Sequence, residues 1–124
     1  MTKKNILVVD DDMSVRTIFS SILRKEGYRV TAAKDGYEAM KAIDQETFYL
    51  ALVDLRMPGL DGIQVLEKIK SRRPKTQVII YSGFGSVEDQ AEAMSKGAVD
   101  YLTKPFSSNE LKARVEKALE NDGS

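Results

Sequence analysis

Five short apolar runs alternate with five amphipathic segments along this chain, and this alternation is the feature that most restricts its fold. The runs predict strands at about residues 5–10, 28–33, 49–53, 77–81 and 99–102. The amphipathic segments predict helices at about residues 13–26, 36–46, 62–72, 86–96 and 108–120. Strands that alternate with helices pair in parallel, and the helices cover both faces of their sheet. We therefore expect an α/β fold.

The pattern inside each run predicts where it lies in the sheet. Runs 5–10, 49–53 and 77–81 are continuously apolar, as expected for central strands with both faces buried. Run 28–33 alternates apolar and polar residues, which predicts an edge strand. In the first helix, the stripe expected to face the core consists of Val15, Ile18, Phe19, Ile22 and Leu23.

Local signals support the helix boundaries. Asp35 with Glu38, and Ser107 with Glu110, have the spacing of capping boxes at helix starts. Pro74 is expected to end the third helix, because proline lacks the amide hydrogen that the helix requires.

Length and composition exclude several classes of protein. The 124 residues predict one domain, with a core at about 4–120 and a frayed tail at 121–124 whose Gly-Ser end resembles a cloning remnant. Lysine plus arginine equals aspartate plus glutamate at 19 each, which disfavours direct binding of nucleic acid. No apolar stretch approaches the roughly 18 residues of a membrane span, and the start lacks a signal-peptide pattern, so we expect a cytoplasmic protein.

The chain contains no cysteine and no histidine. Thiol nucleophiles, disulfides and the commonest general base are therefore excluded. Any chemistry must depend on carboxylates, hydroxyls and lysine.

Three aspartates follow or end apolar runs: Asp10 and Asp11 come after the first run, and Asp54 ends the third. In open parallel sheets these strand ends meet at one edge, where ligands bind. Carboxylates held close together repel one another unless a cation joins them, so the cluster predicts a divalent metal with oxygen ligands. The alternative for the triplet Asp10 to Asp12 is that it caps a helix.

Asp54 begins the turn-rich stretch Asp-Leu-Arg-Met-Pro-Gly, which would leave its carboxylate at the mouth of a loop, where it could attack a phosphoryl group. Ser82 and Lys104 follow the fourth and fifth runs and are expected at the same edge. Alone, the serine is a turn former and the lysine a solvated charge. Tyr101 is expected to be half-buried, with its hydroxyl in water.

These residues, in this order, resemble the receiver domain of a two-component response regulator over about 4–120. The match rests on Asp10 with Asp11, on Asp54 in its Asp-Leu-Arg-Met-Pro-Gly stretch, on Ser82, and on Lys104-Pro105. The resemblance implies a flavodoxin-like doubly wound (βα)5 sandwich with strand order 2-1-3-4-5. The chain is similar to the chemotaxis response regulator and to receivers of ATPase-type transcriptional activators.

The resemblance implies that Asp54 accepts a phosphoryl group from a histidine kinase or a phosphotransfer protein. Mg²⁺ would be held directly by Asp11 and Asp54, by Asp10 either directly or through a water molecule, and by the main-chain carbonyl of Arg56. Lys104 and Ser82 would contact the phosphoryl oxygens, and the Lys104-Pro105 bond would be cis. Such a domain is a signalling switch that assists its own phosphorylation and dephosphorylation, and is not counted as an enzyme.

The resemblance also implies a switch in which the Ser82 hydroxyl moves toward the phosphate while Tyr101 turns inward. The output surface would be formed by the fourth helix, fifth strand and fifth helix, with Val87, Met94, Tyr101 and Phe106 in or near it. For Met94 we expect a core position instead. The partner would be an effector domain or output protein, and a homodimer on phosphorylation is compatible with the pattern. Arg56 and Phe84 stand at positions that tune the acyl-phosphate lifetime, and a bulky Phe84 predicts slow self-dephosphorylation.

Three other functions compete with this reading. A phosphatase of the haloacid dehalogenase type would use Asp10 as nucleophile, but nothing after Lys104 fits that family's later acidic motif. A degenerate receiver would serve only for interaction, which the complete set of five polar positions disfavours. A flavin-binding role is disfavoured because no glycine- and hydroxyl-rich loop follows the first strand.

Overall fold

A computed structural model describes residues 3–83 and 86–120. Its strands are β1 (Asn5–Val9), β2 (Arg29–Ala33), β3 (Leu50–Asp54), β4 (Gln77–Ser82) and β5 (Asp100–Thr103). Its helices are α1 (Met13–Lys25), α2 (Gly36–Gln45), α3 (Gly62–Arg72), α4 (Val87–Ser95) and α5 (Ser108–Glu120). Every boundary lies within about one residue of the sequence prediction, because apolar periodicity and the turn residues agree along the whole chain.

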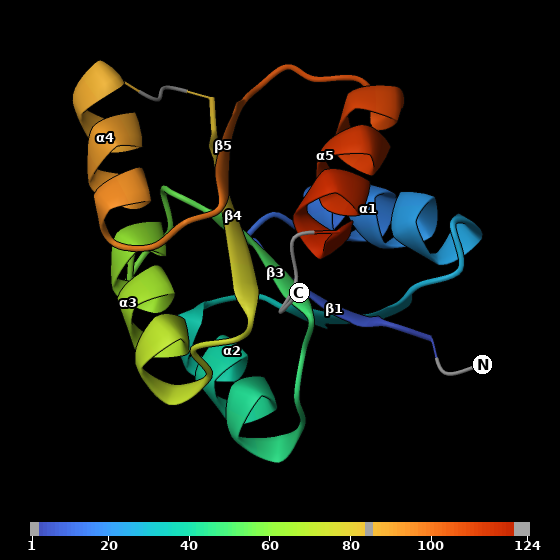
Figure 1. Ribbon diagram of the computed structural model, residues 1–124, viewed down its shortest axis with the longest axis horizontal. Coiled ribbons are helices and arrows are strands. Elements are labelled where there is room, and N and C mark those ends of the chain that lie inside the picture. Colours follow the sequence, from blue (N-terminus) through green and yellow to red (C-terminus); the bar gives the residue numbers. More distant parts are fainter. Residues whose placement is uncertain (1–2, 84–85, 121–124) are drawn as a thin grey trace.

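All five strands are parallel and lie in the order β2-β1-β3-β4-β5, which confirms the predicted topology and the edge position of β2. Figure 1 shows α1 and α5 on one face of the sheet and α2, α3 and α4 on the other. Alternate residues of the central strands supply the two cores: Leu7 and Val9 belong to one core, and Ile6 and Val8 to the other. Burial on both faces explains why β1, β3 and β4 are continuously apolar.

Helix α1 faces the sheet differently from the prediction. Phe19 and Leu23 are buried as expected, but Ile18 is 55% exposed, so its assignment to the core is wrong. Ser20, on the other flank of the stripe, is buried instead. The helix is therefore rotated so that its Ser20 side turns toward β2.

Helix α4 also differs from the prediction. Met94 is 44% exposed, and its expected core position is wrong. The neighbouring Ala93 is fully buried in its place. A short helix that buries one small residue leaves the larger side chain beside it in solvent.

The two predicted capping boxes form only in part. The side chains of Asp35 and Ser107 accept hydrogen bonds from the backbone N–H groups of Glu38 and Glu110, as expected. The Glu38 carboxylate, however, accepts from the N–H of Lys34 and not from that of Asp35. Helix α3 ends two residues before Pro74, as predicted.

Two sequence predictions fall outside the described residues: the role of Phe84 and the frayed tail at 121–124. Within the described ranges, no helix has both the length and the apolar character needed to cross a membrane.

Candidate functional site

The ends of β1, β3, β4 and β5 lie at one edge of the sheet (Figure 1), and a polar residue ends or follows each of these strands. The parallel register pairs Val9 with Val53, so Asp10 comes immediately beyond β1 where Asp54 ends β3. Carboxylate oxygens of Asp10, Asp11 and Asp54 all lie within 4.8 Å of one another. The three predicted acidic residues therefore form one cluster that could hold a metal ion.

Asp10 is held firmly in this cluster. Its side chain is 1% exposed, and its Oδ1 accepts a 2.8 Å hydrogen bond from the N–H of Asp12. Its Oδ2 accepts a 2.7 Å hydrogen bond from the hydroxyl of Tyr81, and the Lys104 ammonium lies 3.9 Å from the same oxygen. A buried carboxylate needs such partners, because an unpaired charge is costly away from water.

The aspartates of the triplet have different surroundings. Asp11 is exposed and faces the cluster, whereas Asp12 caps α1 by accepting hydrogen bonds from the N–H groups of Ser14 and Val15 at 2.8 and 3.4 Å. The alternative that the triplet caps a helix is therefore true of Asp12. Asp10 and Asp11 remain for the acidic site.

Asp54 carries the clearest electrostatic perturbation. Burial raises the pKa of this carboxyl from 3.8 to about 6, and the charge of Asp10 adds to the shift, with Asp11 contributing less. Lys104 and the backbone N–H of Arg56 act in the opposite direction. That N–H lies 3.4 Å from Asp54 Oδ1. A cation at the cluster would favour ionised Asp54, because it offsets the repulsion.

The loop after Asp54 is fixed by a close backbone approach. The N–H of Gly62 donates to the carbonyl of Leu55 at 2.9 Å. A Cβ atom on Gly62 would lie only 2.5 Å from the Asp54 carbonyl oxygen and 2.6 Å from the Leu55 Cα. Only glycine fits at this position, so the start of α3 packs directly against the backbone of Asp54.

Ser82 and Lys104 occupy neighbouring strand ends, as the sequence predicts. Ser82 is fully buried at the end of β4, and its carbonyl accepts a 2.9 Å hydrogen bond from the N–H of Lys104. The Lys104 ammonium lies 5.1 Å from the centroid of the Tyr81 ring. The Lys104-Pro105 peptide bond, which the resemblance implies to be cis, is cis.

Tyr101 differs from the expectation. It is 7% exposed and its hydroxyl is buried, so the prediction of a hydroxyl in water is wrong. Burial raises the pKa of Tyr101, and the nearby Ser82 hydroxyl partly opposes this shift. Among the described residues, the Tyr101 hydroxyl makes no hydrogen bond of regular geometry. The side chain lies inward because β5 places it against the core beneath α4.

An ion pair that the sequence did not predict joins the loop after Asp54 to α4. The Arg56 guanidinium lies 2.9 Å from Asp89 Oδ2, and the same oxygen closes the capping box at the start of α4 by accepting the N–H of Ser86. Both partners flank a groove of about 440 Å³. The residues lie 33 positions apart, and no local sequence signal predicts this pair.

The hydrogen bonds distinguish two chemistries. A phosphatase that used Asp10 as nucleophile would need an accessible carboxylate oxygen, but both Asp10 oxygens are engaged and the side chain is almost fully buried. Asp54 accepts a single long hydrogen bond from Arg56 in the described chain. The arrangement favours Asp54 as the group that attacks a phosphoryl phosphorus.

Comparison with known proteins identifies the same pattern. Residues 6–116 match the sequence profile of the response regulator receiver domain. The transcriptional regulatory protein ZraR of Escherichia coli K12 is 45% identical over 121 residues, which cover 96% of this chain and 27% of ZraR. FixJ of Bradyrhizobium diazoefficiens is 38% identical, covering 95% of this chain and 58% of FixJ. The chain thus spans only about a quarter of ZraR.

Solved structures agree. A CheY-like response regulator receiver domain protein from Methanospirillum hungatei JF-1 superposes with a TM-score of 0.94 at 33% identity, covering 97% of this chain and 96% of the other. The receiver domain of NtrX from Brucella abortus superposes with a TM-score of 0.89 at 36% identity. The match covers 94% of this chain and 99% of the NtrX receiver domain.

Proposed function

The chain belongs to the response regulator receiver domain family, and on this premise we propose that Asp54 accepts a phosphoryl group from a histidine kinase or phosphotransfer protein. The observation that carries the proposal is the cluster of Asp10, Asp11 and Asp54 oxygens within 4.8 Å. In the transfer, an Asp54 carboxylate oxygen bonds to phosphorus while the bond from phosphorus to the donor breaks. The domain acts as a signalling module.

Mg²⁺ is the cation that we assign to the acidic cluster. The carboxylates of Asp10, Asp11 and Asp54 would supply oxygen ligands, which this hard cation prefers, and the main-chain carbonyl of Arg56 would add a fourth. Mg²⁺ would neutralise charge on the transferring phosphoryl oxygens. Asp10 is already oriented for this role by Tyr81 and by the N–H of Asp12.

Lys104 and Ser82 would bind the phosphoryl oxygens once Asp54 is modified. The Lys104 ammonium approaches the cluster from β5, at 3.9 Å from Asp10 Oδ2. Modification adds about −1.5 to −2 charges, which a lysine and a hydroxyl donor can stabilise. Because Ser82 lies beside buried Tyr101, a movement of the Ser82 hydroxyl toward the phosphate changes the packing of that ring.

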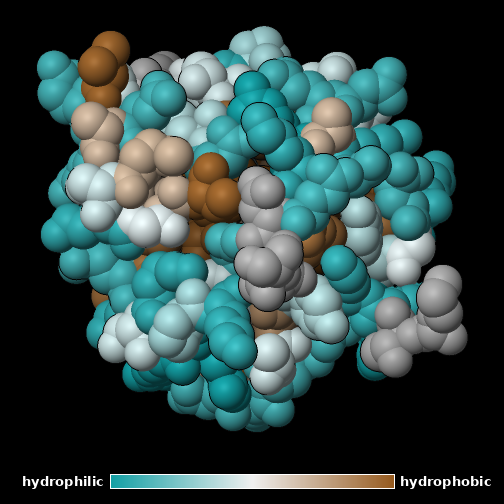
Figure 2. Space-filling model, in the orientation of Figure 1, coloured by the Kyte–Doolittle hydropathy of each residue, from teal (hydrophilic) through white to brown (hydrophobic). Residues whose placement is uncertain are grey.

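The output surface would be formed by α4, β5 and α5. Val87 and Met94 are 81% and 44% exposed on α4, while Phe106 is half-buried after β5. Figure 2 shows apolar residues over α4, at the upper left, among hydrophilic neighbours. Phosphorylation would shift the conformations of this surface toward one that an output domain or output protein binds. The same conformation could instead pair with a second copy of the chain.

The first test is intact mass after incubation with a small-molecule phosphodonor and Mg²⁺. We expect a labile adduct of one phosphoryl group on the wild type, none on Asp54→Asn, and none when a chelator is added. Asp44→Asn is the matched control, because this exposed aspartate pairs with Arg72 outside the site. An adduct that forms equally on Asp54→Asn would contradict the assignment.

A further inference from the structure

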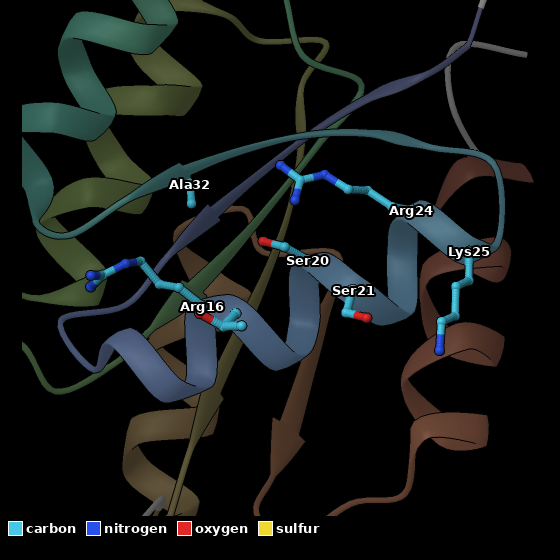
Figure 3. A pocket seen from close by; sticks show the side chains of 7 residues that line it. Arg16, Ser20, Ser21, Arg24, Lys25 and Ala32 are labelled. Carbon is cyan, nitrogen blue, oxygen red and sulfur yellow. The ribbon is translucent and has the colours of Figure 1, made fainter.

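A groove of about 570 Å³ runs between α1 and the edge strand β2, outside the acidic cluster (Figure 3). Its lining includes two arginines, Arg16 and Arg24, three hydroxyl residues, Thr17, Ser20 and Ser21, and Lys25. Among the described residues no carboxylate lines it, although the chain as a whole has no net charge. The strand contributes only the small side chain of Ala32, which leaves the space open.

The arginines of this groove are held in place without being neutralised. Arg16 Nη1 donates to the carbonyl of Asp10 at 2.7 Å, and Arg24 Nη2 donates to the carbonyl of Val30 at 3.1 Å. Within residues 3–83 and 86–120, no ion pair involves Arg16, Arg24 or Lys25. A carbonyl fixes the position of a guanidinium but leaves its charge uncompensated. Each guanidinium has five N–H donors, so further donors remain for a ligand.

Ser20 supplies an independent observation. Its side chain is 4% exposed, and its hydroxyl has no hydrogen-bond partner in the part of the chain that the structure describes. Buried hydroxyls are nearly always paired, because losing water without gaining a partner is unfavourable. In Figure 3 the Ser20 hydroxyl and the Arg24 guanidinium lie on the same side of α1, and the Lys25 ammonium points away from them.

We propose that this groove binds a small phosphate-bearing molecule, whose phosphoryl oxygens accept hydrogen bonds from the Arg24 guanidinium and the Ser20 hydroxyl. Phosphate fits this donor set better than a single carboxylate, because its several terminal oxygens and higher charge can engage the guanidinium and the hydroxyl together. The volume lies in the range of small-molecule sites, so the groove has room for more than the phosphate itself. The acidic cluster repels such an anion when no metal is bound, so the two sites are chemically distinct.

The test is a titration of the full chain with inorganic pyrophosphate, monitored by two-dimensional ¹H–¹⁵N NMR. The titration is done in chelator and at constant ionic strength. We expect shifts of the backbone amides of α1 and β2. The affinity should fall by at least about tenfold in Arg24→Gln, and by several-fold in Ser20→Ala, which leaves the charge unchanged. If Arg24→Gln does not fold, Arg24→Lys takes its place in the test. This variant keeps the charge but loses the planar fork of the guanidinium, so it should also weaken binding.

Lys41→Gln is the matched control, because it removes the same charge from an exposed position on α2. An equal loss of affinity in Lys41→Gln would overturn the proposal, since binding would then follow net charge alone. Shifts confined to the surroundings of Lys104 would overturn it as well. A parallel titration with succinate decides the ligand class: binding as tight as that of pyrophosphate would refute a preference for phosphate.

Discussion

The hydroxyl of Tyr81 donates a 2.7 Å hydrogen bond to Oδ2 of Asp10, and this bond joins β4 to the end of β1 inside the acidic cluster. Both side chains are buried, and the Asp10 carboxylate raises the pKa of Tyr81, as does burial, which has the larger effect. The bond fixes the orientation of the Asp10 carboxylate within the cluster. The tyrosine thus acts on the site through Asp10.

Tyr81→Phe should destabilise the fold by about 1–3 kcal/mol, because a buried carboxylate oxygen loses its closest donor. The measurement is urea unfolding at neutral pH in chelator. Tyr37→Phe is the control: Tyr37 is 64% exposed, and the same loss of a hydroxyl there should change the free energy of unfolding by less than about 0.5 kcal/mol. Equal effects at the two positions would show that the bond to Asp10 contributes nothing.

Gly62→Ala should destabilise the chain by about 1–3 kcal/mol, because its Cβ would lie 2.5 Å from the Asp54 carbonyl oxygen, a backbone atom that cannot rotate away. Thermal unfolding measures the effect. Gly83→Ala is the matched control, since a Cβ there would have no heavy atom within 4 Å. If the two variants unfold at the same temperature, the start of α3 can move away from the Asp54 backbone without cost, and the close approach does not restrict this position to glycine.

Stability should depend on pH through Asp54. Its pKa is about 6 in the folded chain and 3.8 as an ordinary carboxyl, so between these values the folded state keeps a proton that the unfolded state has released. The free energy of unfolding therefore falls as pH rises from about 4 to about 6, and the loss persists above that window. Asp54→Asn lacks this dependence, so its stability relative to the wild type should grow across the window. Calorimetry in chelator measures the free energy of unfolding of the wild type and of Asp54→Asn at each pH. A difference between them that does not change with pH would refute the raised pKa of Asp54.

Mg²⁺ should raise the melting temperature of the wild type, because a ligand that binds only the folded state stabilises it. Asp11→Asn should lose most of this increase, since Asp11 belongs to the acidic cluster. Asp12→Asn is a sharp control: the neighbouring residue carries the same charge but caps α1. It should retain the response to Mg²⁺, whatever its own melting temperature. Loss of the response in both variants would mean that only net negative charge attracts the ion.

The gathering of Asp10, Asp54, Ser82 and Lys104 at one edge could be predicted from the residues themselves, since each follows or ends an apolar run. In a parallel sheet, the ends of all strands point the same way. The order of the strands followed only from the resemblance to the receiver family. The bond from Tyr81 to Asp10 could not be predicted, because it joins residues 71 positions apart. From the sequence, Tyr81 is expected to be an aromatic residue of the core. Its hydroxyl reaches the site because the register of β3 and β4 places Tyr81 beside Asp54.

The wrong predictions on α1 and α4 share one physical cause. Periodicity identifies the apolar stripe of a helix, but the rotation of the helix on its sheet depends on how neighbouring elements pack. Ile18 and Met94 are therefore exposed, while Ser20 and Ala93 are buried.

The sequence by itself determined the alternation of strands and helices, the parallel topology and the residue types at the acidic edge, because these follow from periodicity and chain order. Only the tertiary structure decided which side chains orient the site, such as Tyr81 on Asp10 and Asp89 on Arg56. It also decided that two arginines and a buried serine border a groove beside β2. Such contacts join distant segments, and their geometry is set by the packing of whole elements.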